Sequence, residues 1–189
     1  MIFLLFMLFF QELKAPEIKL KPQFCAHCVN LQPFNDWWQF QSGMEGGYSN
    51  DKNDSGGETM RGITWLTAKN LGLTYSQFRN LSAEQAKGIA YNYFWLPNAK
   101  FGSDRLNMLV SSAFWGGGGY DLVREMQKIL NITQDGIIGE MTILAANEAG
   151  PELFHKLLNC RTRYLRGCWN YGYYRHGWQK SIDFLTNYE

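Results

Sequence analysis

Helix signals follow one another along the chain after Pro33, and this succession constrains the fold more than any other feature. Ser82 with Gln85 forms a capping box before an apolar-periodic segment, and Asp36 with Gln39 offers a similar helix start further upstream. Glycines and prolines close the periodic segments, and strand-like alternation appears nowhere at length. The sequence therefore predicts a mainly α fold. Helices are expected over residues 36–44, 64–71, 82–96, 104–114, 120–130, 140–148, 151–169 and 178–188.

One polar stretch interrupts the helices: EGGYSNDKNDSGGETMRGIT, residues 45–64. The turn-forming residues at 50–51 and 55–57 allow one small hairpin inside it. An EF-hand calcium loop is excluded, because the acids at 51–54 lack the required alternation and no terminal bidentate Glu follows at the right spacing. We therefore expect a small irregular or hairpin loop after the first helix.

Length and composition narrow the class of protein. A chain of 189 residues with 46% hydrophobic residues forms one domain, or one domain with two lobes, and is not disordered. A net charge of +1 gives no support to a nucleic-acid partner, and we expect none. Aromatic residues make up 16% of the chain; most should pack in the core, while exposed rings could stack on sugar rings.

The amino-terminal segment carries an uncharged run, MIFLLFMLFF, over residues 1–10. This run is too short for a transmembrane helix of about 20 residues and matches the apolar part of a signal peptide. No Lys or Arg precedes it, and no small-x-small cleavage site follows closely. We expect export, with transient membrane contact through residues 1–10 or a mis-assigned start as the alternatives. Residues 11–33 are polar, aperiodic and interrupted by prolines, as in a surface linker.

The four cysteines are Cys25, Cys28, Cys160 and Cys168. The Cys25-Ala-His-Cys28 segment could be half a zinc site or a redox pair, but no second such pair and no βαβ pattern accompanies it. We interpret all four as structural and expect no metal and no cofactor. Cys160 and Cys168 would lie about 12 Å apart along one predicted helix, too far for a disulfide. Any bridge would therefore join Cys25 or Cys28 to one of them.

Glu45 opens the polar stretch at the carboxyl end of an apolar and aromatic helix. The helix dipole and the neighbouring aromatic surface both disfavour a carboxylate there, so both raise its pKa. A carboxylic acid kept protonated near neutral pH is what general-acid cleavage of a glycosidic bond needs. The alternative is an ordinary solvated surface charge.

Asp54 and Thr59 follow Glu45 within the same polar stretch. A loop that doubles back over this distance could bring a carboxylate and a hydroxyl opposite Glu45, where they could hold or activate water on the far face of a sugar. Gly46, Gly47 and the glycines at 56–57 would let the backbone approach a ligand closely.

The stretch EGGYSNDKNDSGGETMRGIT resembles the signature of the glycoside hydrolase family 108 muramidases. That family is lysozyme-like and includes phage endolysins and proteins labelled secretion activators. The resemblance covers roughly residues 34–185 and continues into the peptidoglycan-binding half that accompanies the family. Further matching segments are Tyr93-Phe94-Trp95, residues 126–130, residues 135–142, residues 161–165 and Gly177-Trp178.

The resemblance implies roles for individual residues. Glu45 matches the catalytic glutamate, and Asp54 and Thr59 fall close to the Glu, Asp, Thr order of phage-type lysozymes, with Thr59 one residue early. Where the family usually shows an Asp and then an Asn before a glycine, this chain has Ser111 and Trp115. This departure changes the far wall of the expected cleft and bears on substrate preference more than on the acid step.

The implied activity is that of a peptidoglycan hydrolase, an N-acetylmuramidase that cleaves the β-1,4 bond between N-acetylmuramic acid and N-acetylglucosamine. Tyr48, Trp115 and Tyr120 would line the sugar cleft. Two alternatives remain: a lytic transglycosylase acting on the same bond, and a non-catalytic cell-wall-binding protein that retains the fold.

The expected organisation has three parts: an apolar segment and linker arm over 1–33, a catalytic lysozyme-like lobe over 34–106, and a helical peptidoglycan-binding-like lobe over 107–189. The expected partners are peptidoglycan glycan strands, and we expect a monomer. The site of action would be the periplasm or the cell wall, reached by export or by phage-mediated release.

Overall fold

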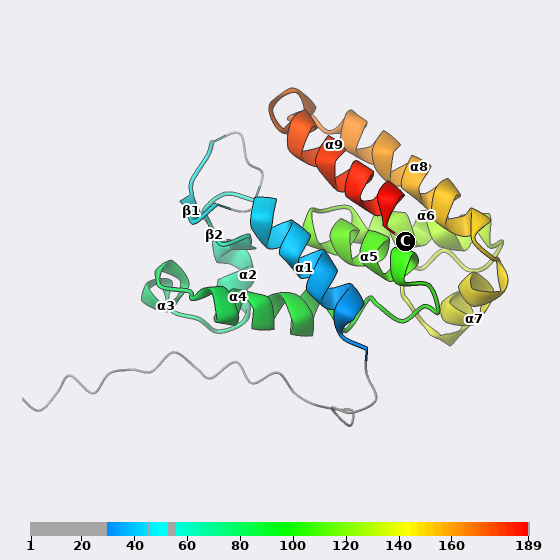
Figure 1. The fold of residues 1–189 in the computed structure, drawn as a ribbon, viewed down its shortest axis with the longest axis horizontal. Helices are drawn as coiled ribbons and strands as arrows, with labels where there is room; N and C mark the ends of the chain where they lie inside the picture. Colours follow the sequence, from blue (N-terminus) through cyan, green and yellow to red (C-terminus); the bar gives the residue numbers. More distant parts are fainter. Residues whose placement is uncertain (1–29, 45, 53–55, 189) are drawn as a thin grey trace, which may run out of the picture.

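The computed structural model describes residues 30–44, 46–52 and 56–188, and most of these residues lie in helices (Figure 1). The prediction of a mainly α fold with a small hairpin region after the first helix is confirmed. Most of the amino-terminal arm, with residues 1–10, Cys25 and Cys28, lies outside the described residues. The helices are α1 (Gln32–Met44), α2 (Trp65–Asn70), α3 (Tyr75–Arg79), α4 (Ala83–Ile89), the π-helix η1 (Ala90–Trp95), α5 (Asp104–Trp115), α6 (Gly119–Ile129), α7 (Glu140–Glu148), α8 (Glu152–Gly167) and α9 (Tyr171–Asn187).

Local capping explains where several helices begin. The Ser82–Gln85 capping box starts α4 as predicted, with both reciprocal hydrogen bonds present. Thr74 and Gln77 form a second box of the same kind, and it starts α3, a helix that the sequence analysis did not predict. Thr64 caps α2 by accepting a hydrogen bond from the Thr67 amide at 3.1 Å. Short polar motifs thus fix the helices around the polar stretch.

Two predicted helix starts were wrong. Helix α1 begins at Gln32, whose amide donates to Asn30 Oδ1 at 3.0 Å, so Asp36 lies inside the helix. The Asp36 carboxylate instead accepts a hydrogen bond from Tyr188 Oη at 3.0 Å, which ties α1 to the carboxyl-terminal helix. Helix α9 begins at Tyr171 rather than near Trp178, because Gly172 and Gly177 interrupt the apolar pattern without interrupting the helix.

The helix that starts at Ser82 changes into a π-helix after Ile89. Its wider turn is visible in the hydrogen bond from the Leu96 amide to the Tyr91 carbonyl, five residues back, at 2.8 Å. Aromatic rings of the π-helix pack against two neighbouring helices. Tyr91 packs edge-on against Phe34 of α1, and Phe94 packs edge-on against Trp115 of α5.

The buried side chains form two clusters. The larger one joins α1, η1, α5, α6, α8 and α9 around fully buried residues such as Trp37, Met108 and Leu157. The smaller one lies beneath the sheet and joins it to α2, α3 and α4 through Ile63 and Phe78. Side chains of the larger cluster come from both sides of residue 106, where the boundary between lobes was expected. The division into two lobes stays a prediction.

The polar stretch contains a three-stranded antiparallel sheet in the order β1 (Tyr48–Ser49), β2 (Thr59–Met60), β3 (Ile63–Thr64). Tyr48 lies opposite Met60, and Thr59 lies between Ser49 and Thr64 on the flanking strands. Arg61 and Gly62 form the tight turn between β2 and β3 with φ of 50° and 78°, the left-handed pair that favours a two-residue hairpin. None of the helices within the described residues combines the length and the apolar character needed to cross a membrane.

Candidate active site

The end of α1 and the sheet that follows it form the region where the sequence placed the catalytic groups. Met44 ends the helix, and Gly46 and Gly47 lead into β1. Glu45 and Asp54, two of the predicted catalytic residues, lie outside the described residues. Beside Gly46, a hollow of about 40 Å³ lies between Trp38 and Arg61, a volume suited to water and not to a sugar ring.

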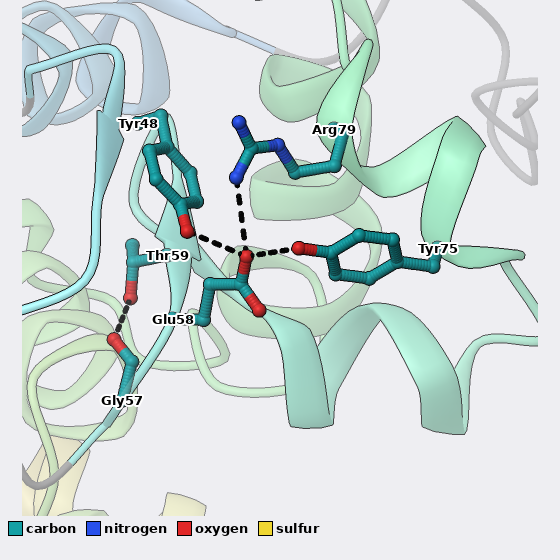
Figure 2. Close-up of polar contacts among 6 residues, drawn as sticks. All are labelled: Tyr48, Gly57, Glu58, Thr59, Tyr75 and Arg79. Carbon is teal, nitrogen blue, oxygen red and sulfur yellow. Dashed lines mark hydrogen bonds and ion pairs between the residues drawn. The ribbon is translucent and has the colours of Figure 1, made fainter.

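A carboxylate that the sequence analysis did not name lies at the centre of the best-defined polar cluster (Figure 2). Glu58 Oε1 accepts hydrogen bonds from Tyr48 Oη at 2.7 Å, from Tyr75 Oη at 2.5 Å and from Arg79 Nη1 at 3.2 Å. Figure 2 shows that these three side chains converge on one oxygen from β1 and from α3. The Arg79 guanidinium also lies 3.5 Å from the centre of the Tyr48 ring.

The charge state of Glu58 follows from these contacts. Hydrogen bonds from Tyr75 and Tyr48, with a smaller contribution from Arg79, hold the pKa of Glu58 below its ordinary value. The same hydrogen bonds raise the pKa of both tyrosines. Glu58 is therefore an ionised acceptor at neutral pH and cannot serve as a general acid. Its contacts hold the sheet against α3.

Backbone hydrogen bonds also fix the position of the sheet. The Arg61 amide donates to the Gly47 carbonyl at 2.9 Å, and the Trp65 amide donates to the Glu58 carbonyl at 2.7 Å. The Arg61 side chain reaches across to the Leu81 carbonyl, with Nε donating at 3.0 Å. The sheet that carries Thr59 is thus fixed on several sides.

The structure places two of the predicted site residues, Tyr48 and Thr59, on neighbouring strands of this sheet. Thr59 is partly buried and its hydroxyl donates to the Gly57 carbonyl at 3.1 Å, as Figure 2 shows. The lone pairs of that hydroxyl oxygen can still accept a hydrogen bond, for example from water. Tyr48 is 41% exposed, so its ring can meet a ligand even while its hydroxyl is engaged by Glu58.

The two other predicted sugar-binding residues lie at the end of α5 and on α6. Trp115 is partly buried and packs edge-on against Trp37 and Trp38 of α1. Tyr120 is 64% exposed and packs edge-on against Phe114, with ring centres 5.1 Å apart. Trp115 therefore forms part of the packing beneath α1, whereas Tyr120 presents its ring to solvent.

Aromatic residues near the start of α9 lie next to the polar stretch, and the sequence analysis did not place them there. Tyr174 Oη, near the start of α9, donates to Asp51 Oδ2 at 3.1 Å, just after β1. Gly177 lies against Met44, the last residue of α1. The density of aromatic residues in YGYYRHGW was the available signal. Trp169 and Tyr173 add exposed rings to the same end of the helical hairpin.

No group of three or more His, Cys, Asp or Glu side chains in the described parts of the chain is arranged to hold a metal ion. The described side chains of the region are carboxylates, hydroxyls, a guanidinium and aromatic rings. Carboxylates close to aromatic surface are the groups that glycoside cleavage uses.

Comparisons with known proteins match part of the chain to one family and its fold to one solved structure. Residues 39–118 match the family model described as glycosyl hydrolase 108, a span that includes Glu45, Tyr48, Asp54, Thr59 and Trp115 and ends before Tyr120. The solved structure of SagA from Brucella abortus superposes with a TM-score of 0.69 at 23% identity, over 80% of this chain and 90% of that chain. At that identity the likeness establishes the fold. No curated protein matches the chain. The chain therefore carries a glycosyl hydrolase 108 domain on a lysozyme-like, mainly α fold, and it is a glycoside hydrolase.

Proposed function

We propose that this peptidoglycan hydrolase of the lysozyme type is an N-acetylmuramidase, which cleaves the β-1,4 bond between N-acetylmuramic acid and N-acetylglucosamine. The observation that carries the proposal is the family match over residues 39–118, because that span contains Glu45, Asp54 and Thr59 in the order of a lysozyme active site. The expected substrate is the glycan strand of peptidoglycan.

Glu45 is the proposed general acid and protonates the leaving oxygen. It directly follows α1, and a helix carboxyl end next to aromatic side chains favours the neutral acid over the carboxylate. The contrast with Glu58 supports the assignment, because Glu58 is ionised by its three hydrogen-bond donors and has no proton to give. Two carboxyls in different environments can thus have different roles within one short stretch.

Asp54 and Thr59 are the proposed partners of Glu45 on the opposite side of the sugar. Asp54 would orient water or stabilise the positive charge that develops on the sugar, and Thr59 would position that water. The anchored sheet supports this role for Thr59, since a water-positioning hydroxyl must be held in place. Tyr48, Trp115 and Tyr120 are the proposed sugar-contacting residues.

The test is loss of turbidity of purified peptidoglycan sacculi with the wild type and with Glu45→Gln. The amide keeps the shape and removes the transferable proton, so lysis should fall by roughly 10²–10⁴-fold. Glu84→Gln is the matched control, because Glu84 is an exposed glutamate in the first turn of α4 within the family match. The control should lyse walls at the wild-type rate. Lysis by a folded Glu45→Gln at that same rate would overturn the assignment.

The products decide between the muramidase and a lytic transglycosylase. Hydrolysis adds water to the cleaved bond, whereas a transglycosylase closes an internal ring on the muramic acid and adds none. Digestion in ¹⁸O-labelled water followed by mass spectrometry should therefore show one labelled reducing end for each bond cleaved. Ring-closed products without label would replace the muramidase with the transglycosylase.

The cell wall is the place of action of a peptidoglycan hydrolase. We propose that the chain works there as a monomer, in the periplasm or the wall, after export through residues 1–10 or phage-mediated release. Fractionation of cells that produce the full chain, followed by mass measurement of the mature protein, tests this route.

A further inference from the structure

A groove separate from the proposed active site lies between α6 and α8. Its volume is about 580 Å³, within the range of sites that hold small ligands. Both helices line it, and the glycine run before α6 contributes Gly118. The lining residues that the argument uses are Asp121, Glu125, Lys128, Arg161, Arg163 and Tyr164.

Arg161 is the unusual residue of this groove, since it is only 6% exposed. Within the described residues its one hydrogen bond runs from Nη1 to the Gly117 carbonyl, and no carboxylate lies within ion-pair distance of it. Burial lowers the pKa of Arg161 to about 10, which still leaves a cation at neutral pH. Buried charges are normally paired, so a guanidinium with unused donors that lines a groove points to an anionic ligand.

The glycines before α6 make room for this arrangement. A Cβ on Gly116 would lie 3.2 Å from Arg161 Nη2, and a Cβ on Gly118 would lie 2.5 Å from the Tyr164 ring. Gly118 also has a φ of 83°, which L side chains rarely adopt. The backbone can therefore approach Arg161 and Tyr164 closely only because residues 116–118 lack side chains.

Charges of both signs line the groove. Lys128 and Arg163 are cationic, and Asp121 and Glu125 on α6 are anionic. Such a lining fits a ligand that carries both carboxylates and an amino group, and a simple anion would meet repulsion from the two acids. Peptides with a free carboxylate and a diamino acid have this chemistry.

We propose that the groove between α6 and α8 binds the peptide stem of peptidoglycan, with a stem carboxylate at Arg161 and a stem amino group at Asp121 or Glu125. The inference rests on the proposed function for the identity of the ligand. It gives the enzyme a second contact with the wall, on the peptide and not on the glycan.

The test measures binding of a synthetic stem pentapeptide, Ala–γ-D-Glu–Lys–D-Ala–D-Ala, to the wild-type chain by calorimetry. The same peptide with every carboxylate converted to an amide is the matched probe. A charge-assisted hydrogen bond accounts for a factor of roughly ten or more, so the amide should bind at least about tenfold more weakly. Equal binding of the two probes, or no binding of either, would overturn the proposal.

Alkylation of the groove cysteines reports where the peptide binds. Cys160 and Cys168 line the groove, are partly exposed and form no disulfide with each other, and the protein is reduced before the reaction. The free-acid peptide should slow their reaction with a maleimide, read residue by residue by mass spectrometry, and the amide peptide should not. Binding without this protection would place the peptide elsewhere and overturn the site.

Variants and a second substrate complete the test. Arg161→Gln should bind the free-acid peptide and the amide peptide with equal affinity. If that variant fails to fold, Glu125→Gln is the second variant, and it should weaken binding of both peptides by the same factor. Cleavage of glycan strands stripped of peptide tests the muramidase proposal independently of the peptide-binding proposal. Cleavage of bare glycan without peptide binding would refute the groove and leave the muramidase, whereas peptide binding without cleavage would refute the muramidase and leave the groove.

Discussion

Replacing Gln127 by Leu should destabilise the carboxyl-terminal half of the chain strongly, although the two side chains are similar in size. Gln127 lies on α6 and is 1% exposed. Its Nε2 donates to Asp135 Oδ1 at 2.7 Å, to the Ile137 carbonyl at 3.0 Å and to Thr142 Oγ1 at 3.2 Å, and its Oε1 accepts from the Gly136 amide at 2.8 Å. One side chain thus holds the whole turn between α6 and α7.

The size of the expected destabilisation depends on which hydrogen-bond partners of Gln127 would be left unpaired in the variant. An amide NH₂ has two hydrogens, so the three acceptors share two hydrogen bonds. Two of them keep other partners, because Asp135 still accepts from the Ile137 amide and the Ile137 carbonyl still accepts from Thr142. The buried Gly136 amide has no other acceptor among the described residues. Its unpaired N–H costs about 1–3 kcal/mol, and the loss of the remaining bonds brings the total to roughly 2–4 kcal/mol.

The assay is thermal unfolding at pH 7, followed by circular dichroism. For a chain of this size each kcal/mol corresponds to about 2–4 °C, so the melting temperature should fall by roughly 5–12 °C. Gln39→Leu is the matched control, because Gln39 is an exposed glutamine on α1. A melting temperature of Gln127→Leu equal to that of the control would refute the reasoning.

Two further variants test the turn itself and the polar cluster at the sheet. Gly136 has a φ of 78°, so Gly136→Val should lower the stability of the protein by about 1–3 kcal/mol. The control Gly139→Val should lower it less, because Gly139 is extended and has open space around it. Equal melting temperatures of the two variants would contradict this prediction. Glu58→Gln should lower both the melting temperature and wall lysis. The pKa of Glu58 is lower in the folded state than its ordinary value of 4.5, so the stability that its carboxylate contributes is present above pH 4.5 and is lost as the pH falls below that value. The difference in melting temperature between wild type and Glu58→Gln should therefore shrink in acid. A difference that stays constant with pH would argue against the charged cluster.

The fold could be predicted where the signal was local. The box at Ser82 and Gln85 starts α4, and a Ser103 cap starts α5 at the expected residue. The local signal failed at α1, because Asp36 is of a residue type that favours helix caps but lies inside the helix, which begins at Gln32. The π-helix could not be predicted, because its rings pack against Phe34, which is far away in the sequence.

In the candidate site, too, only the features set by residues close in sequence could be predicted. A small hairpin region was predicted in the polar stretch, and the structure places Tyr48 and Thr59 on two of its adjacent strands, an assignment that the prediction did not make. The role of Glu58 could not be predicted, because it depends on Tyr75 and Arg79, and these come from the one short helix that the periodicity did not reveal. The pattern of residues made Glu45 and Asp54 candidates, with an ordinary surface charge as the alternative for Glu45, and the resemblance to a known family then favoured catalytic roles for both.

The loop between β1 and β2 is held near both of its ends by elements that are distant in sequence. At one end Asp51 accepts a hydrogen bond from Tyr174 of α9, and at the other end Glu58 accepts hydrogen bonds from Tyr75 and Arg79 of α3. Asp54 lies in the sequence between these two anchors. Fixing both ends of a short loop limits the conformations open to the residues between them. One of the anchors belongs to the carboxyl-terminal helix, so the position of the proposed catalytic loop depends on α9 and not only on the first half of the chain.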